Sequence, residues 1–447
     1  MRTISAAVHF AFAAGVLLAV TANAATETYT DGNGIEWTYQ PGSEIADGTT
    51  SATLGNGSEA CIAASASVDA ADIPWTFTNN GTSYTVTAIA KCAFNECKEL
   101  YGTLSIPEAV TNMGVRAFYK CSNLSGIATI GGVTKLNEES FREDSGLEGT
   151  DYPDLSRVVT IGKNVFNYCK MGGIVRLDAL SGHSNCDSAF NMAAITRVHF
   201  PRRAFNLSGN TLFIECKNLT GVYIPGPDPD SGKSLIRRSK CFSGCTSLKV
   251  FLAGPHTGLS NNYGKTDQNM FANVSGCRIF VPTGSNWDTE TDDEKGLAAY
   301  EASNTVFYYG AGRELDLSFD HDAKMITAMP ATAYAFTNVL AAAAIFKSEF
   351  GYDTRINVTN AIEIAAGSVN AEEMSGVTFD SLTFAVKTQA QLDTVIASVP
   401  AAIPLAIDPE GATESLTVKM EDRKIYVMLP TNGTYKIRQG GFIIIVK

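Results

Sequence analysis

Cysteine is the residue type in this chain with the widest chemical reach, since a thiol can form a disulfide, bind a metal or act as a nucleophile. Five of the ten cysteines stand three residues after a phenylalanine, as the pairs Phe94/Cys97, Phe118/Cys121, Phe166/Cys169, Phe213/Cys216 and Phe242/Cys245. Equivalent places after other phenylalanines hold Asp144, Ala193 and Val274. These three residues interrupt any cluster of metal ligands. The pattern therefore favours a small, buried packing residue over a metal ligand or a nucleophile.

The other five cysteines lie outside this series, at Cys61, Cys92, Cys186, Cys241 and Cys277. In an exported chain some of them could pair as disulfides, for instance Cys61 with Cys92. Sequence alone leaves their connectivity open.

Histidine and carboxylate patterns give no positive indication of an enzyme, and no cofactor is expected. The chain contains no H-E-x-x-H, no G-x-S-x-G and no G-x-x-x-x-G-K-[ST] motif. Asp320, His321 and Asp322 are adjacent, but alternation along a strand would put both carboxylates on one side and the imidazole on the other. This cluster is therefore interpreted as the surface end of a strand.

The phenylalanines themselves are spaced regularly, and this spacing predicts the fold. Equivalent rings occur at Phe94, Phe118, Phe141, Phe166, Phe190, Phe213, Phe242 and Phe271. Each unit also has an apolar stretch that often ends in proline, as in "LSIP", "VHFP", "VYIP" and "IFVP". Units of about two dozen residues cannot bury their apolar side chains alone, so we expect stacked coils that form a continuous parallel sheet. The rise per coil should be about 4.8 Å.

The sequence predicts five segments. Residues 1–24 end in Ala22-Asn23-Ala24 after a short apolar run, which predicts a secretory signal cleaved after Ala24. The remaining segments are a β-rich N-terminal cap at 25–85, a solenoid of about eight coils at 86–282, an acidic linker at 283–305 and an α+β module at 306–447 that ends in a β meander. Within the module, residues 331–350 should form a buried helix.

Net charge and hydropathy limit the partners. The formal net charge of −12 argues against a nucleic-acid partner, which would favour a basic face. No later stretch reaches 18 apolar residues, so no transmembrane segment is expected after signal removal. The predicted localisation is secreted or at a cell surface.

The repeat units resemble the BspA-like leucine-rich repeats of bacterial surface and secreted proteins. The phrases that carry the resemblance are "VTAIAKCAFNECKEL", "VTNMGVRAFYKCSNL", "VVTIGKNVFNYCK" and "LFIECKNLTGVYIP", and they fall between Val86 and Pro282. The third unit, with Asp144, and the fifth, "AFNMAAIT", depart from the pattern. The resemblance implies a leucine-rich-repeat solenoid, mostly β with short helical pieces, and adhesion at a bacterial surface or to host matrix.

Residues in the middle of each repeat strand are expected to face outward on the concave sheet. In the later coils these residues are the binding candidates Arg176, His199, Tyr223, Phe251 and Phe280. Exposed aromatic clusters are costly unless a partner covers them. Two explanations remain open: the cluster binds a ligand, or the module after Val306 folds back over the rings.

The sequence thus favours an exported, non-enzymatic solenoid that binds a protein or a glycan. One alternative is a structural envelope or assembly component in which the repeats act as spacers. A third hypothesis is a hydrolase whose active site lies in the C-terminal module. The ligand and the oligomeric state are not determined by the sequence.

Overall fold

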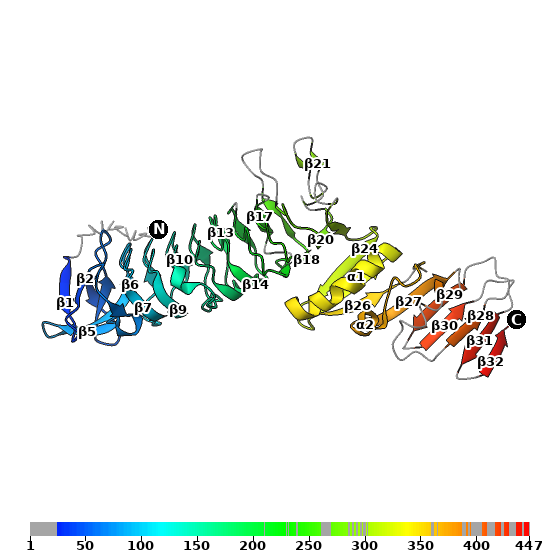
Figure 1. Ribbon diagram of the computed structural model, residues 1–447, viewed down its shortest axis with the longest axis horizontal. Coiled ribbons are helices and arrows are strands. Elements are labelled where there is room, and N and C mark those ends of the chain that lie inside the picture. The colour runs from blue at the N-terminus through cyan, green and yellow to red at the C-terminus, as the bar shows by residue number, and fades with distance from the viewer. Residues whose placement is uncertain are drawn as a thin grey trace, which may run out of the picture.

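The computed structural model forms an extended molecule in which a β-rich end, a solenoid and an α/β module follow one another in chain order (Figure 1). It describes residues 25–446 apart from 210, 229, 231, 238–239, 261–269, 285–286, 288–289, 292–293, 296, 298–300, 302, 359–361, 364, 387–389, 392–393, 395–404, 409–415, 422–423, 429–434 and 440–441. The predicted signal at 1–24 lies outside the described residues.

The N-terminal end is a sheet that closes the first coil. Its strands are β1 (Glu27–Thr30), β2 (Glu36–Glu44), β3 (Thr50–Leu54), β6 (Thr82–Ile89) and β5 (Thr76–Asn79), in that spatial order, with β8 (Asn112–Met113) paired to β6. The Trp37 ring lies 6.3 Å from the ring of Phe94 and so covers the open end of the core. Because β6 also pairs with the solenoid strand β8, the cap and the solenoid share a sheet, and the boundary expected at 85/86 falls within β6.

Two ribbons of parallel strands run along the solenoid. The first ribbon begins with a sheet of three strands, β4 (Val68–Asp69), β7 (Leu100–Ile106) and β9 (Asn123–Ile130). It continues with a sheet of six strands that we call the long sheet: β12 (Gly172–Arg176), β14 (Ala194–His199), β16 (Gly221–Ile224), β18 (Val250–Ala253), β20 (Arg278–Pro282) and β23 (Thr305–Tyr309). The second contains β10 (Lys135–Leu136), β11 (Thr160–Ile161), β13 (Gly182–Ser184), β15 (Phe205–Leu207), β17 (Ser234–Arg237) and β19 (Thr257–Ser260). Short 3-10 turns occur at η1 (Ala70–Asp72) and η2 (Ser145–Leu147). The solenoid fold predicted from the repeat is confirmed.

The phenylalanine spine forms the centre of the solenoid. We use this name for the eight rings Phe94, Phe118, Phe141, Phe166, Phe190, Phe213, Phe242 and Phe271, each at most 1% exposed. Neighbouring ring centroids are 4.8 to 6.0 Å apart, and neighbouring planes differ by 2° to 22°. The spacing in the sequence thus becomes one stacked column of offset rings.

The cysteines that follow the spine are buried thiols, and no disulfide joins any of the ten cysteines. The thiols of Cys121, Cys169, Cys216 and Cys245 each donate to the carbonyl of the spine phenylalanine one coil back, with Sγ–O distances of 2.6 to 3.2 Å. Burial raises the pKa of the Cys121, Cys169 and Cys216 thiols, which keeps them protonated as donors. The candidate pairing of Cys61 with Cys92 is therefore not formed.

Each coil turns sharply two residues after its spine phenylalanine. There φ lies between 60° and 75° at Glu96, Lys120, Glu143, Tyr168, Met192, Glu215, Gly244 and Asn273. Left-handed backbone costs a residue with a Cβ roughly 1–2 kcal/mol. Hydrogen bonds between coils offset this cost, since the Glu96 N–H donates to Tyr119 O at 2.7 Å and the Glu143 N–H donates to Asn167 O at 2.9 Å. Because seven of the eight positions are not glycine, these left-handed turns could not be predicted from the positions of glycine in the sequence.

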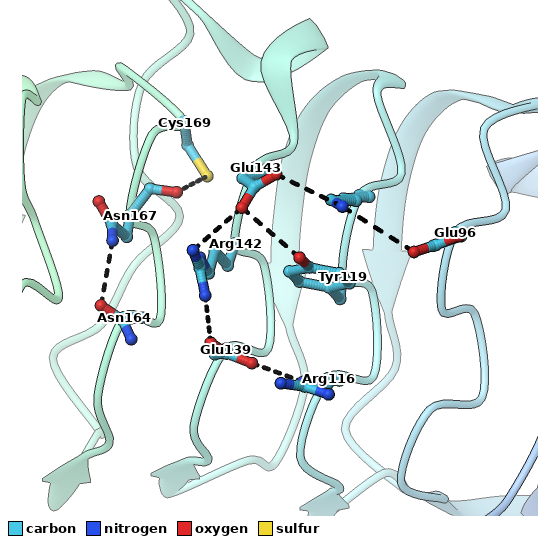
Figure 2. Close-up of polar contacts among 10 residues, drawn as sticks. Glu96, Arg116, Tyr119, Glu139, Arg142, Glu143, Asn164, Asn167 and Cys169 are labelled. Atoms are coloured by element: carbon cyan, nitrogen blue, oxygen red, sulfur yellow. Dashed lines mark hydrogen bonds and ion pairs between the residues drawn. The ribbon is translucent and has the colours of Figure 1, made fainter.

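Charged side chains link the first, second and third coils along this turn (Figure 2). Glu139, which is 5% exposed, accepts hydrogen bonds from Arg116 and Arg142. Burial alone would raise the pKa of Glu139, but these two bonds hold it below its ordinary value. Lys120 Nζ lies 4.9 Å from the centroid of the Tyr119 ring and 3.7 Å from a carboxylate oxygen of Glu143. We assign this cluster to coil stacking, because its charges contact one another across coils.

Described residues of the segment at 283–305 are anchored in the solenoid, contrary to the expected acidic linker. Trp287 and Leu297 lie in the solenoid core, at 0% and 2% exposed, and the Trp287 ring is 5.8 Å from Phe251. The segment includes β21 (Glu290–Thr291) and β22 (Glu294–Lys295) and leads into β23, which pairs in parallel with β20. The solenoid sheet therefore runs to Tyr309, and the expected module boundary at Val306 cuts this strand. Acidic residues around two apolar anchors produced the linker-like composition.

The C-terminal module is built on a mixed sheet. Its order is β24 (Leu315–Asp320), β25 (Met325–Pro330), β26 (Asp353–Asn357), β27 (Thr378–Val386), β29 (Leu416–Glu421) and β30 (Lys424–Met428), and β28 (Leu405–Asp408), β31 (Tyr435–Gln439) and β32 (Phe442–Val446) form a second sheet. Helix α1 (Ala333–Ile345) connects the parallel strands β25 and β26 and continues as the π-helix Phe346–Phe350, and α2 spans Ala371–Ser375.

Helix α1 is buried on two sides, which explains its apolar sequence. Thr332 caps its N-terminus by accepting from the Ala335 N–H at 3.1 Å. One core cluster joins the helix side chains Phe336, Val339 and Leu340 both to the module strands and to the long sheet. A helix that is apolar around its whole circumference requires such a double contact. The helix therefore holds the module against the solenoid.

Gly221 on β16 makes close docking of the module possible. A Cβ built there would lie 3.0 Å from a ring carbon of Phe350 and 3.2 Å from the Cβ of Glu349. We expect Gly221→Ala to lower the free energy of unfolding by about 1–3 kcal/mol through overpacking, and to increase hydrogen exchange in the π-helix. The control is Gly126→Ala on β9, where the added Cβ meets only the Thr103 side chain, at 3.4 Å or more. Equal effects of the two substitutions would contradict this role for Gly221.

Candidate functional site

The five predicted binding residues do not form one exposed stripe. Strand pairing aligns Arg176, His199, Tyr223, Leu252 and Phe280 on successive strands of the long sheet. Arg176 is exposed and His199 is half-buried, whereas Tyr223 is 7% and Phe280 0% exposed. The two ends of the predicted stripe therefore have different environments.

Phe251 faces the interior, so the expectation that it faces outward is wrong. It pairs with Val222 and Ile279 and packs on Phe242, with ring centroids 5.5 Å apart. The outward-facing residue lies nine residues after Phe190 and Phe271 but ten after Phe213 and Phe242, so a count of nine from Phe242 was one residue too short. A shift of one residue moves a side chain to the other face of a sheet.

The module covers the remaining outward-facing rings, which is the second of the two explanations left open by the sequence. Tyr223 lies 5.3 Å from both Phe350 and Tyr352, and Phe280 lies 5.7 Å from Phe346, measured between ring centroids. Polar contacts flank these rings: Arg197 Nε donates to Glu349 at 2.8 Å, and Arg278 Nε donates to Asn338 at 3.0 Å. These rings are thus part of an intramolecular interface.

A cavity of about 300 Å³ opens where the uncovered long sheet meets the module, and we call it the junction pocket. It brings together three of the predicted residues with others from both sides of the junction. Its lining is Arg176, Asp178, Val198, His199, Phe200, Pro201, Arg202, Tyr223, Pro225, Lys324, Glu349, Phe350 and Tyr352. The π-helix supplies Glu349 and Phe350, and the turn between β24 and β25 supplies Lys324.

Cations outweigh anions in the junction pocket. Arg176, Arg202 and Lys324 line it together with two carboxylates, Asp178 and Glu349. Glu349 is already bonded to Arg197, and the shortest separation between Arg176 and Asp178 is 3.9 Å. This positive region contrasts with the overall charge of −12. A cluster of this kind attracts an anionic group.

The neighbouring cations affect the pKa of the His199 imidazole. Burial lowers its pKa most and Arg176 lowers it next; Asp178 opposes them, while Arg197 and Lys324 lower it further. At neutral pH the ring is therefore uncharged and can both donate and accept a hydrogen bond. His321, just beyond the lining, has its pKa lowered by burial and by Arg202 and Lys324.

We expect an NMR titration to give His199 a pKa below 6.5, and Arg176→Gln to move it upward by removing a neighbouring cation. A pKa at or above 6.5 in the wild-type protein would contradict the positive field. Arg157→Gln is the matched control, since Arg157 is exposed, pairs with Glu108 and does not line the pocket.

Hydroxyl groups complete the site. The Tyr223 hydroxyl is buried and has no hydrogen-bond partner among the described residues, and its burial raises its pKa. The neighbouring Tyr352 hydroxyl lies 2.7 Å from Nδ1 of His321. A buried hydroxyl without a partner is costly, so a ligand hydroxyl or water at Tyr223 would be stabilising.

Sequence analysis missed Arg202, Lys324, Glu349, Phe350 and Tyr352. The adjacent pair Arg202-Arg203, which begins three residues after the end of β14, was a usable signal, because adjacent cations stand out in an acidic chain. The module residues gave no signal, because only docking brings them to the solenoid. His321 was interpreted as a surface residue, and its contact with Tyr352 was not expected.

Two features of the described residues bear on other functions. No group of three or more histidine, cysteine, aspartate or glutamate side chains there has a metal-binding arrangement. In the same part of the chain, no helix has the length and apolar character needed to cross a bilayer.

Comparison with known families identifies the repeat. A family described as "BspA type Leucine rich repeat region" matches in six copies, over residues 76–186, 156–253 and 177–286. These overlapping ranges contain the whole phenylalanine spine. No curated protein matches the chain.

Three solved structures that are similar to this chain are leucine-rich repeat proteins from bacteria. One from Bacteroides ovatus is 18% identical, with 71% of this chain and 83% of that chain covered and a TM-score of 0.36. The leucine-rich repeat protein of T. pallidum is 20% identical, with 50% and 82% covered and a TM-score of 0.31. A leucine-rich cell surface protein from Faecalibacterium prausnitzii is 18% identical, with 64% and 96% covered and a TM-score of 0.28. The fold assignment therefore rests on the repeat motif and the stacked coils.

Proposed function

We propose that the protein is exported and binds a protein or glycan ligand at a bacterial surface. The premise is that its solenoid consists of BspA-type leucine-rich repeats. The observation that carries the proposal is the junction pocket, where polar and charged side chains converge on a cavity of about 300 Å³. Ligand pockets commonly lie at domain junctions and combine apolar walls with a few placed polar groups. Arg176 and His199 approach it from the uncovered sheet, and the module supplies its opposite wall.

The proposal does not require the aromatic side chains of the later coils as a docking surface. Tyr223, Leu252, Phe280 and Phe307 already pack against the module. Ligand contacts are instead expected at the boundary of this interface, where Arg176 and Arg202 retain about half of their side-chain exposure. A rigid junction between two packed domains also reduces the ordering cost of binding.

An array of matrix proteins and glycans, probed with the full chain, tests this function. We expect selective binding that is lost in the double variant Arg176→Gln/His199→Gln and retained in Arg157→Gln. Circular dichroism and melting temperature establish that the double variant remains folded. Equal binding by the folded double variant and the wild-type protein, or no binding to any array member, would reject the proposal.

A further inference from the structure

The junction pocket contains two kinds of polar group that few ligands satisfy together. Arg176, Arg202 and Lys324 offer N–H donors and positive charge. Asp178 and Glu349 offer carboxylate oxygens, which only accept hydrogen bonds. A ligand that fits both sets carries a negative charge and also hydrogen-bond donors, and a hydroxyl-rich acid supplies both.

We propose that the junction pocket binds a carboxylate-bearing monosaccharide unit, an acidic sugar, within a larger glycan. This inference deepens the proposed function and rests on it, because it assigns a chemical class to the ligand of the same pocket. A sugar ring with a carboxylate has the required charge, several hydroxyl donors and an apolar face. The cavity of about 300 Å³ lies at the lower end of the size range of small-ligand pockets and suits one such unit.

The cations come from three separate segments and converge on this cavity. Arg176 ends β12, Arg202 follows β14, and Lys324 lies in the turn between β24 and β25. Guanidinium groups can hold a carboxylate through two parallel N–H···O bonds. The ion pairs of Arg202 with Asp228 and Asp322 are long, at 3.4 and 3.9 Å, so a ligand carboxylate can compete with them.

The remaining lining suits the sugar hydroxyl groups and ring. The buried Tyr223 hydroxyl has no partner among the described residues, and the uncharged His199 can donate or accept. The cavity also has an apolar wall, formed by the partly exposed Phe350 and the buried Phe200. An acidic peptide side chain would satisfy the cations, but donors for Asp178 and Glu349 would have to come from separate backbone N–H groups, whereas one sugar ring carries its carboxylate and several hydroxyl donors together. The donor and acceptor set therefore favours the sugar.

Isothermal titration calorimetry with the full chain tests the inference, with methyl glucuronide as the probe. Methyl glucoside, which lacks the carboxylate, and a short glutamate peptide, which lacks the ring, are the comparison ligands. We expect a dissociation constant on the order of 1 mM for the glucuronide. Affinity should be roughly tenfold or more weaker for the glucoside and the peptide. Raising the salt concentration should weaken glucuronide binding.

The variants locate the binding. Arg202→Gln should weaken glucuronide binding roughly tenfold or more, and Arg157→Gln should leave it unchanged. Equal affinities for glucuronide and glucoside, tighter binding of the peptide, no detectable glucuronide binding, or an unchanged affinity in Arg202→Gln would each overturn the inference. If the array still identifies a ligand that requires Arg176 and His199, the proposed function stands while the sugar class fails. If the array is also negative, both fail.

Discussion

Phe166→Ala is expected to lower the free energy of unfolding by about 3–5 kcal/mol. The Phe166 ring lies at the centre of the phenylalanine spine, 5.3 Å from Phe141 and 5.8 Å from Phe190 between centroids, and it meets Tyr152 edge-on at 5.1 Å. Its removal leaves a cavity that backbone hydrogen bonds between coils prevent from collapsing. Because each coil is stabilised by its neighbours, the loss also weakens the coils on both sides.

Chemical denaturation followed by circular dichroism measures this loss. Tyr168→Ala in the same coil is the matched control, since Tyr168 is 47% exposed and its removal creates no cavity. We expect the control to change the free energy of unfolding by less than about 0.5 kcal/mol. A Phe166 variant no less stable than the Tyr168 variant would show that the stacked rings do not determine the stability of the solenoid.

Asp144→Asn is expected to stabilise the protein by about 1–3 kcal/mol at pH 7. Asp144 occupies the cysteine position of the third coil and is 0% exposed. One carboxylate oxygen accepts from the Cys121 N–H at 2.7 Å, and the other has no partner among the described residues. The equivalent thiols donate to the phenylalanine carbonyl one coil back, which for Asp144 is that of Phe118. An asparagine amide supplies such a donor without a charge.

The effect of Asp144→Asn on the free energy of unfolding should depend on pH. Burial raises the pKa of Asp144 well above 3.8 and the neighbouring Glu143 raises it further, against the hydrogen bond from the Cys121 N–H, which lowers it. As pH rises above 3.8 the unfolded chain loses this proton while the folded chain retains it, so stability falls until the raised pKa is reached. The slope is about 1.4 kcal/mol per pH unit for one proton. The advantage of Asp144→Asn should therefore be large at pH 7 and small near pH 4.

Denaturation at both pH values tests this behaviour, with Glu148→Gln as the control because Glu148 is exposed and pairs with Lys170. The control should show no comparable change between the two pH values. A constant difference between Asp144→Asn and the wild-type protein from pH 4 to pH 7 would contradict an elevated pKa at Asp144.

The sequence predicted the features that repeat and missed those that do not. Phenylalanines at Phe94, Phe118 and their equivalents revealed the stacked spine because each coil must solve the same packing problem. The count failed at Phe251, because the outward-facing residue lies nine residues after some spine phenylalanines and ten after others. It also failed at Trp287, because acidic neighbours concealed an apolar anchor. These local changes break the period without leaving a pattern of their own.

The junction pocket could be predicted only in part. Arg176, His199 and Tyr223 were identified because they follow the strand register. Lys324 and Glu349 lie more than a hundred residues further along the chain, and the docking of α1 brings them to the pocket. Gly221 permits that docking, but a single glycine in a short strand carries no signal of a domain contact. The site therefore depends on tertiary packing that no local pattern encodes.

The titration of His199 in the presence of methyl glucuronide tests the central claim most directly, because it reports charge inside the junction pocket. A bound carboxylate would offset Arg176, Arg197 and Lys324, so the pKa of His199 should rise toward its ordinary value at saturation. The imidazole resonances of His183, which does not line the pocket, should stay in place. A glucuronide that binds without moving the pKa of His199 would contradict a ligand site at this junction.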